Sequence, residues 1–128
     1  IVELHGSAWR LRCDHCEIVI DDHNPEHYNN WKCDNDHWLR PDIVWFNDFL
    51  IPAVAQMADE NISKSDLFIS IGTSGVVWPA AGFPQIASSN GATLIEINPE
   101  PSEQSGLYDH VFRGKASDML KAIFGNPN

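Results

Sequence analysis

The chain has 128 residues and a mass of 14.4 kDa, with 43% hydrophobic residues and a formal net charge of −10. This length and composition suit a soluble globular protein with a core of its own, and no apolar run approaches the length of a membrane span, which argues against a membrane protein. Eight basic residues against eighteen acidic ones argue against a nucleic-acid partner, because phosphate binding depends on clustered Lys and Arg.

The start of the chain and its cysteine count add two expectations. The chain opens at Ile1 without a methionine or a leader-type segment, so we expect it to be a piece of a longer protein. Three cysteines cannot all pair with one another. Without a secretory segment, this odd number favours a reducing, cytoplasmic compartment in which thiols bind metal.

Apolar periodicity predicts the elements in chain order. Residues 1–4 have the pattern of a short buried strand that ends at His5-Gly6. A polar stretch over 9–40 carries all three cysteines and has too little aliphatic content for its own core, so a bound metal would supply its order. Strand patterns then occupy 39–46, 67–71, 93–97 and 110–113, and helix patterns occupy 51–62, 79–89 and 115–124.

Strands and helices alternate through the second half of the chain, which is typical of βαβ units and of an open parallel sheet with helices on both faces. We therefore expect an α/β fold: part of a Rossmann-like sheet, with a small inserted zinc-ribbon module. The expected organisation assigns 1–8 and 41–128 to the Rossmann-like domain and 9–40 to the zinc-binding module.

The cysteine spacing predicts a tetrahedral zinc site. Cys13 and Cys16 form a CxxC pair, and Cys33 opens a second short knuckle at the distance seen in zinc ribbons. Three residues could supply the fourth ligand: His37, Asp36 and His15. The first is favoured, because Cys3His is a common structural zinc set and carboxylates are rarer in such sites. The competing interpretation is one disulfide plus a free thiol, or three unrelated buried cysteines.

Polar clusters fall at three predicted strand ends, where ligands of open α/β sheets bind. His5 could accept a proton, because histidine changes charge near neutral pH. The GTSG turn at 72–75 offers backbone N–H groups, two hydroxyls and a helix start, which favour a phosphate. Asn98 and Glu100 could hold a ribose hydroxyl. Each feature alone is common in structural turns, so the predicted nucleotide crevice rests on all three.

Five segments in this order resemble the successive motifs of the sirtuins, the NAD-dependent protein lysine deacylases. They are ELHGS at 3–7, the CxxC pair, LRPDIVWF at 39–46, DLFISIGTSGVVWPAA at 66–81 and IEINPEPS at 95–102. The resemblance covers nearly the whole chain but only the later part of a sirtuin, since the family's GAGIS-type loop and QNID-type segment are absent. It implies a fragment that lacks the first NAD-binding motif and is inactive alone.

By this resemblance, the whole enzyme transfers an acyl group from a protein or peptide lysine to ADP-ribose and releases nicotinamide. His5 matches the family's catalytic histidine, the general base toward the nicotinamide ribose. The positions that would contact NAD are Gly72, Thr73, Ser74, Asn98 and Ala116. Val44 and Phe46 would line the acyl-lysine tunnel. Cys13, Cys16 and Cys33 would hold a structural zinc remote from the reaction.

Two departures from the family pattern stand out. Asn47-Asp48 replaces the usual Gly-Glu, in a loop that normally pairs with the substrate peptide as an added strand. The usual fourth cysteine is also missing. The alternative to an enzyme is a non-catalytic zinc-ribbon module on an α/β scaffold that binds a protein or a nucleotide without turnover.

Overall fold

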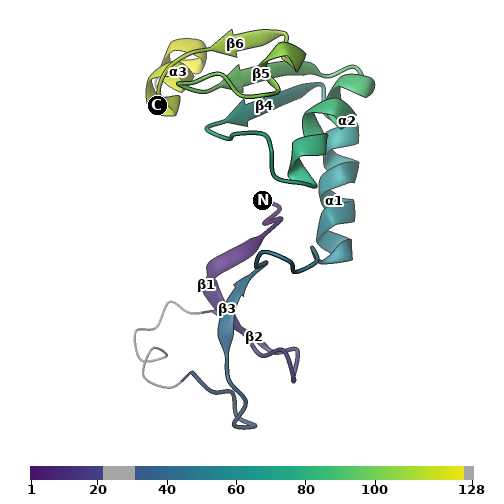
Figure 1. The fold of residues 1–128 in the computed structure, drawn as a ribbon, viewed down its shortest axis with the longest axis vertical. Helices are drawn as coiled ribbons and strands as arrows, with labels where there is room; N and C mark the ends of the chain where they lie inside the picture. The colour runs from purple at the N-terminus through teal and green to yellow at the C-terminus, as the bar shows by residue number, and fades with distance from the viewer. Residues whose placement is uncertain (22–30, 126–128) are drawn as a thin grey trace. The chain divides into compact units, whose positions relative to one another are not determined.

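The computed structural model describes residues 1–21 and 31–125, which divide into two compact units, Ile1–Gln56 and Met57–Asn128 (Figure 1). Each unit has its own cluster of buried residues. The predicted organisation into 1–8, 9–40 and 41–128 stays a prediction.

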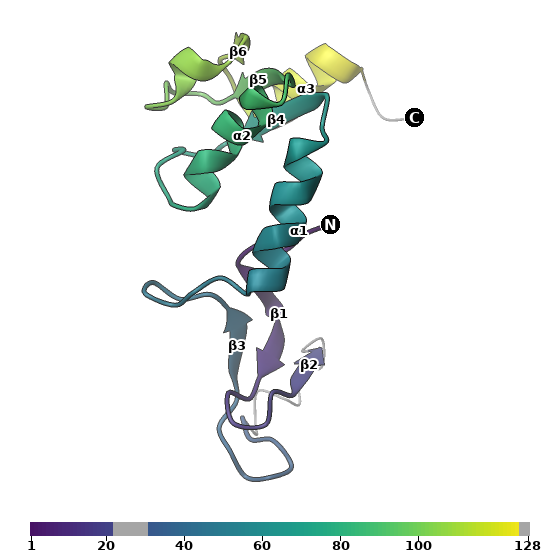
Figure 2. The ribbon, with the colours of Figure 1, turned by 90° about the vertical axis from the view of Figure 1, so that its right-hand side faces the viewer.

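The first unit is a three-stranded antiparallel sheet in the order β2-β1-β3. Its strands are β1 (Gly6–Arg12), β2 (Val19–Asp21) and β3 (Arg40–Ile43), and Figure 2 shows β1 and β3 side by side. The ladder between β1 and β3 pairs Gly6 with Ile43 at one end and Arg12 with Arg40 at the other, with an irregularity between them.

The strand predicted at 1–4 is wrong. Residues 1–5 form no strand, and the backbone N–H of Gly6 donates to Glu3 O at 3.0 Å, which closes a turn just before β1. Apolar residues form a strand only where a neighbouring strand satisfies their backbone groups. The strand therefore begins at Gly6, where pairing with Ile43 begins.

The core of the first unit is small and rich in cysteine. Its buried residues are Leu11, Cys13, Cys33 and Leu39, and Cys16, Ile20 and Trp31 pack against them. Half of the buried cluster therefore consists of thiols, as the low aliphatic content of 9–40 led us to expect.

The second unit contains a parallel sheet in the order β4-β5-β6, which confirms the α/β class. The strands are β4 (Leu67–Ile71), β5 (Thr93–Ile97) and β6 (His110–Phe112). The helices are α1 (Pro52–Ser63), which begins in the first unit, α2 (Phe83–Ser89) and α3 (Ala116–Phe124), with 3-10 turns at Ala80–Gly82 and Ser105–Leu107. In the part of the chain that the structure describes, no helix is long and apolar enough to cross a membrane.

The core of the second unit lies between α2 and the sheet, because α2 contacts both β4 and β5. Ala87, Ala92 and Leu94 are buried there, and Ile62, Phe68, Leu107 and Tyr108 pack around them. The helix predicted at 79–89 is divided, since the 3-10 turn precedes α2. A proline at the second position of α2 suits a helix start, because it has no N–H to leave unpaired.

Candidate functional site

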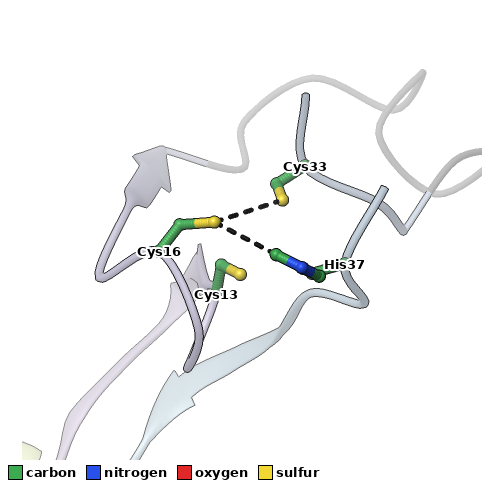
Figure 3. A group of neighbouring side chains, drawn as sticks. All are labelled: Cys13, Cys16, Cys33 and His37. Atoms are coloured by element: carbon green, nitrogen blue, oxygen red, sulfur yellow. Dashed lines mark hydrogen bonds between the residues drawn. The ribbon is translucent and has the colours of Figure 1, made fainter. Parts of the chain in front are cut away.

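Four potential metal ligands converge between two turns of the first unit: Cys13, Cys16, Cys33 and His37 (Figure 3). One ligand atom from each lies within 4.8 Å of all the others. Cys13 is fully buried and Cys33 is 7% exposed, while Cys16 and His37 are half-buried. All three cysteines are free, which excludes the interpretation as one disulfide plus a thiol.

The distances in this cluster fit Zn²⁺. With Zn–S bonds of about 2.3 Å and a tetrahedral shell, neighbouring sulfurs lie about 3.8 Å apart. Cys16 Sγ lies 3.8 Å from Cys33 Sγ and 3.2 Å from His37 Nδ1. A closed set of three thiolates and one imidazole matches a structural zinc site, because no position remains open for a substrate.

Two tight turns place the ligands. Glu17 N donates to Cys13 O at 3.0 Å, and Asp36 N donates to Cys33 O at 2.9 Å. Glu17 and Asp36 have φ values of 55° and 61°, in the left-handed region. Backbone reversal right after each cysteine knuckle brings the sulfurs together, and Asp tolerates this conformation better than most residues.

The surroundings of the sulfurs act in opposite directions on two of the thiols. Asn35 Nδ2 donates to Cys16 Sγ at 3.3 Å, which favours the thiolate, but burial and the neighbouring Cys13 and Cys33 outweigh this bond and raise the pKa of Cys16. Burial disfavours a charge on Cys33, but backbone N–H groups of Asn35 and His37 oppose that effect, and the pKa of Cys33 lies below its ordinary value. Hydrogen bonds of this kind orient and tune metal ligands.

The structure separates the three candidates for the fourth ligand. The Asp36 carboxylate forms an ion pair with Lys32 Nζ at 2.6 Å, which also holds the pKa of Asp36 below its usual range. The exposed His15 ring lies 4.8 Å, centroid to centroid, from the His37 ring and is outside the ligand group. His37 is therefore the residue that completes the set.

His5 and Val44, two of the predicted site residues, are joined by a backbone hydrogen bond from Val44 N to His5 O at 3.0 Å. This bond lies just beyond the Gly6–Ile43 end of the ladder between β1 and β3. The His5 side chain is exposed, and Phe46 is 90% exposed. The first unit thus presents the histidine and the two predicted tunnel residues from neighbouring segments of chain.

The unusual Asn47-Asp48 pair forms a turn. Asp48 N donates to Trp45 O at 3.0 Å, and Trp45 N donates to Asp48 Oδ2 at 3.3 Å. Asn47 has a φ of 77°, a conformation that glycine adopts most easily and that asparagine adopts more readily than most residues. Asn47 can therefore adopt the left-handed backbone conformation that the family's usual glycine would adopt at this position.

In the second unit, Gly72 and Asn98 meet at the carboxyl edge of the parallel sheet. Gly72 N donates to Ile97 O at 3.0 Å, which ties the end of β4 to the end of β5. Asn98 Nδ2 donates to Thr73 O at 2.8 Å, and Asn98 N donates to Phe112 O at 3.1 Å. Asn98 therefore links the loops that follow β4 and β5 to the last residue of β6.

The Gly72–Gly75 loop has the backbone geometry that glycine provides. Gly72 has a φ of 63° and Gly75 has a φ of 70°. Thr73 Oγ1 accepts from Gly75 N at 3.2 Å, and Ser74 is exposed beside it. Ala116 is the first residue of α3. All five positions predicted to contact NAD thus belong to the second unit.

Glu96 forms a buried charge network at this edge that was not predicted from the sequence. It is 2% exposed and lies one position before the end of β5. Its Oε2 accepts from Ser105 Oγ at 2.6 Å and pairs with Arg113 Nη1 at 2.9 Å, while Oε1 accepts from Ser102 Oγ. Burial disfavours the charge, but these partners outweigh it and lower the pKa of Glu96. A single carboxylate within an otherwise apolar strand was the available signal.

Comparisons with known proteins place the chain in a family. The Sir2 family model matches residues 1–79, more than half of the chain. This chain belongs to the Sir2 family. It is 43% identical over 126 residues to NAD-dependent protein deacylase 2 of Pyrobaculum aerophilum, a match covering 96% of this chain and 50% of that protein. The chain therefore spans about half the length of the curated Sir2 relatives it matches.

Solved Sir2 structures share the fold. A crystal structure of a Sir2 homologue with NAD matches with a TM-score of 0.88 at 35% identity, over 95% of this chain and 48% of that one. A Sir2 complex with the inhibitor EX-527, 2′-O-acetyl-ADP-ribose and a deacetylated p53 peptide matches with a TM-score of 0.84 at 25% identity, over 95% and 54%. The sirtuin resemblance found in the sequence is thereby confirmed.

Proposed function

We propose that this chain forms the later part of an NAD-dependent protein lysine deacylase, which transfers the acyl group of a lysine to ADP-ribose and releases nicotinamide. Membership of the Sir2 family supports this proposal, as do relatives named NAD-dependent protein deacylases. The observation that carries it is the convergence of the Gly72–Gly75 loop and Asn98 at one edge of the parallel sheet.

The residues of the second unit suit the pyrophosphate and adenosine part of NAD. Gly72, Thr73 and Ser74 would offer backbone N–H groups and hydroxyls to the phosphate and ribose. The Asn98 amide nitrogen is engaged by Thr73 O, so its Oδ1 would accept from a ribose hydroxyl. Ala116 would lie beside the adenine, where a small side chain leaves room for the base.

The residues of the first unit suit the part of NAD at which the reaction takes place, the nicotinamide ribose, and the acyl-lysine that reacts with it. NAD supplies the ribose carbon that accepts the acyl oxygen. His5 would act as the general base toward a hydroxyl of that ribose, and its exposed ring is free to reach a ligand. Val44 and Phe46 would flank the aliphatic part of the acyl-lysine and exclude water from it. Solved Sir2 structures that hold a p53 peptide support a peptide substrate.

The zinc cluster would be structural in this enzyme. Cys13, Cys16, Cys33 and His37 would hold the ion and order the segment between β1 and β3. Three free thiols suit a reducing compartment, which supports a cytoplasmic location. The surplus of acidic residues supports protein substrates rather than nucleic acid as partners.

The decisive test uses a fusion protein. The remaining half of the Pyrobaculum aerophilum relative is placed before Ile1, and nicotinamide release from NAD is followed with an acetyl-lysine peptide. We expect turnover from the fusion, none from the chain alone, and a loss of at least about a hundredfold in His5→Ala, as is usual when a general base is removed. His15→Ala is the matched control, because this exposed histidine belongs to neither proposed site.

Three outcomes would count against the proposal in different ways. Equal rates for the fusion and its His5→Ala variant would remove His5 from the mechanism. Binding of NAD without nicotinamide release would favour the non-catalytic binding module. Absence of both binding and turnover in a folded, zinc-loaded fusion would overturn the proposed function as a whole.

A further inference from the structure

We propose that Glu96 and Arg113 are positioning residues for NAD: through the loop that follows β5, they hold the Asn98 amide in place for the adenosine ribose. This inference rests on the proposed function and adds two residues to it. Neither residue would touch the dinucleotide.

Glu96 is unusual for its position. A strand buried in a parallel sheet is normally apolar throughout, and a carboxylate there loses most of its hydration. Replacing both members of such a buried ion pair by apolar side chains is often neutral or stabilising, so stability alone does not account for a carboxylate at this position, although removal of one partner is costly. Its hydrogen bonds are directional, however, and every protein group that it reaches through them lies on the loop after β5 or at the end of β6.

Arg113 connects that carboxylate to the loop backbone. Besides pairing with Glu96, its Nη1 lies 3.3 Å from Asn98 O and 3.2 Å from Glu100 O, and its Nη2 donates to Ser105 Oγ at 2.9 Å. One guanidinium therefore reaches the first residue of the loop, its third residue and the turn that ends it. A planar group with five donors can make such contacts together, whereas a lysine ammonium is a single point charge.

The serines complete the frame. Ser102 and Ser105 donate to the two oxygens of Glu96, and Ser102 N donates to Ser105 Oγ at 2.8 Å. The loop from Asn98 to Ser105 is thus bound to a buried carboxylate at its far end and to Arg113 along its length. This arrangement fixes the direction in which the Asn98 side chain leaves the sheet.

The consequence for the ligand concerns Asn98 Oδ1. The other polar groups of Asn98 are engaged: N with Phe112 O, Nδ2 with Thr73 O, and the backbone carbonyl with Arg113. Precise placement of Oδ1 requires the loop to be held, because a hydrogen bond weakens steeply once its geometry is lost. Glu96 and Arg113 therefore act on the nucleotide through Asn98.

The experiment measures ADP-ribose affinity and the KM for NAD in the fusion protein. In Glu96→Gln, which keeps the shape and removes the charge, we expect about a tenfold weaker affinity for ADP-ribose and a tenfold higher KM for NAD, with kcat within about twofold. The matched control is Glu103→Gln, an exposed carboxylate in the same loop, which should leave all three values unchanged.

Two further variants separate positioning from a general loss of structure. In the Asn98→Ala background, Glu96→Gln should cost no further affinity, because its effect passes through Asn98. Arg113→Lys keeps the charge, so unfolding should be close to that of the wild type while the KM for NAD still rises. It also provides the test if Glu96→Gln fails to fold.

The possible failures are distinguishable. If the wild-type fusion turns over NAD and Glu96→Gln or Arg113→Lys leaves its KM unchanged, or if the effects of Glu96→Gln and Asn98→Ala add, this inference is overturned and the proposed function stands. If the wild-type fusion neither binds ADP-ribose nor turns over NAD, both are overturned together.

Discussion

Substitution of Gly6 by alanine tests the link between the backbone of β1 and the placement of His5. Gly6 has a φ of 76°, and a Cβ built there would lie 2.0 Å from Asp42 O and 3.1 Å from Ile43 Cα. Ordinary contacts begin near 3.4 Å, so the two strands would have to move apart by about 1.4 Å at this point. No rotamer change can relieve the clash, because both partners are backbone atoms.

The cost can be worked from these contacts. The left-handed conformation costs an alanine about 1–2 kcal/mol. Separation of the strands would also break the flanking bond between the two segments, from Val44 N to His5 O, at about 1 kcal/mol. We expect Gly6→Ala to lower the free energy of unfolding of the first unit by about 2–3 kcal/mol.

Gly91→Ala is the matched control. Gly91 has a similar φ of 88°, but a Cβ there would meet nothing within 4 Å. It should therefore show only the conformational cost of about 1–2 kcal/mol. The difference between the two variants isolates the backbone clash.

Urea unfolding of the zinc-loaded chain provides the assay, because the two units carry different signals. Four of the five tryptophans precede Met57 and report the first unit by fluorescence: Trp9, Trp31, Trp38 and Trp45. Helix circular dichroism reports mainly the second unit, where α2, α3 and most of α1 lie. If Gly6→Ala costs no more than Gly91→Ala, the backbone of β3 does not approach Gly6 closely enough to exclude a Cβ, which refutes the predicted clash.

Two further predictions concern the metal and the pH. We expect the zinc content of the purified chain, measured by mass spectrometry, to fall from one ion per chain to none in Cys33→Ser and to be reduced in His37→Ala. Asp36→Ala should keep its zinc. Unchanged zinc content in both Cys33→Ser and His37→Ala would reject the ligand set. Folding lowers the pKa of Glu96 below the value of about 4.5 that it has in the unfolded chain. The Glu96 charge therefore stabilises the folded second unit at any pH above about 4.5, and this stabilisation is lost as the pH falls through the lower pKa of the folded state. The stability difference between wild type and Glu96→Gln, from urea unfolding at a series of pH values, should therefore be constant above pH 4.5 and shrink below it; a constant difference down to pH 2 would contradict this sign.

The elements of the second unit could be predicted from local pattern alone. The apolar runs at Leu67–Ile71 and Thr93–Ile97 coincide with β4 and β5, and the stripe predicted over 51–62 matches α1 (Pro52–Ser63) to within one residue at each end. These patterns suffice because a mostly apolar run of β-favouring residues is typical of a strand in a parallel sheet, even where it carries one buried polar residue, as Ser70 does in β4 and Glu96 in β5. The apolar start of the chain was misassigned, because strand formation there depends on a partner, β3, which pairs only from Gly6 onward.

The site could be predicted only as far as side-chain chemistry and spacing determine it. Spacing left three candidates for the fourth metal ligand, and the choice depends on Lys32, which engages the Asp36 carboxylate. Glu96 could be singled out as a carboxylate in an apolar run, but its partners could not be predicted from the sequence. Arg113 pairs with Glu96 only because β6 lies beside β5, and sequence separation gives no sign of that contact.

The metal cluster and the predicted catalytic histidine lie at opposite ends of the same pair of strands. Cys13 follows β1 and His37 precedes β3, while His5 precedes β1 and Val44 follows β3. The ladder between these strands therefore connects the zinc ligands to the His5–Val44 hydrogen bond over about 20 Å, the length of a seven-residue strand. Because thiols make up half of the buried cluster of this unit, loss of the metal would loosen the ladder at its Arg12–Arg40 end. That end is the one far from His5, and the irregularity between Ser7 and Leu11 interrupts the ladder before it reaches the Gly6–Ile43 pair. We therefore expect metal loss to disorder the cysteine turns first and the His5–Val44 hydrogen bond last.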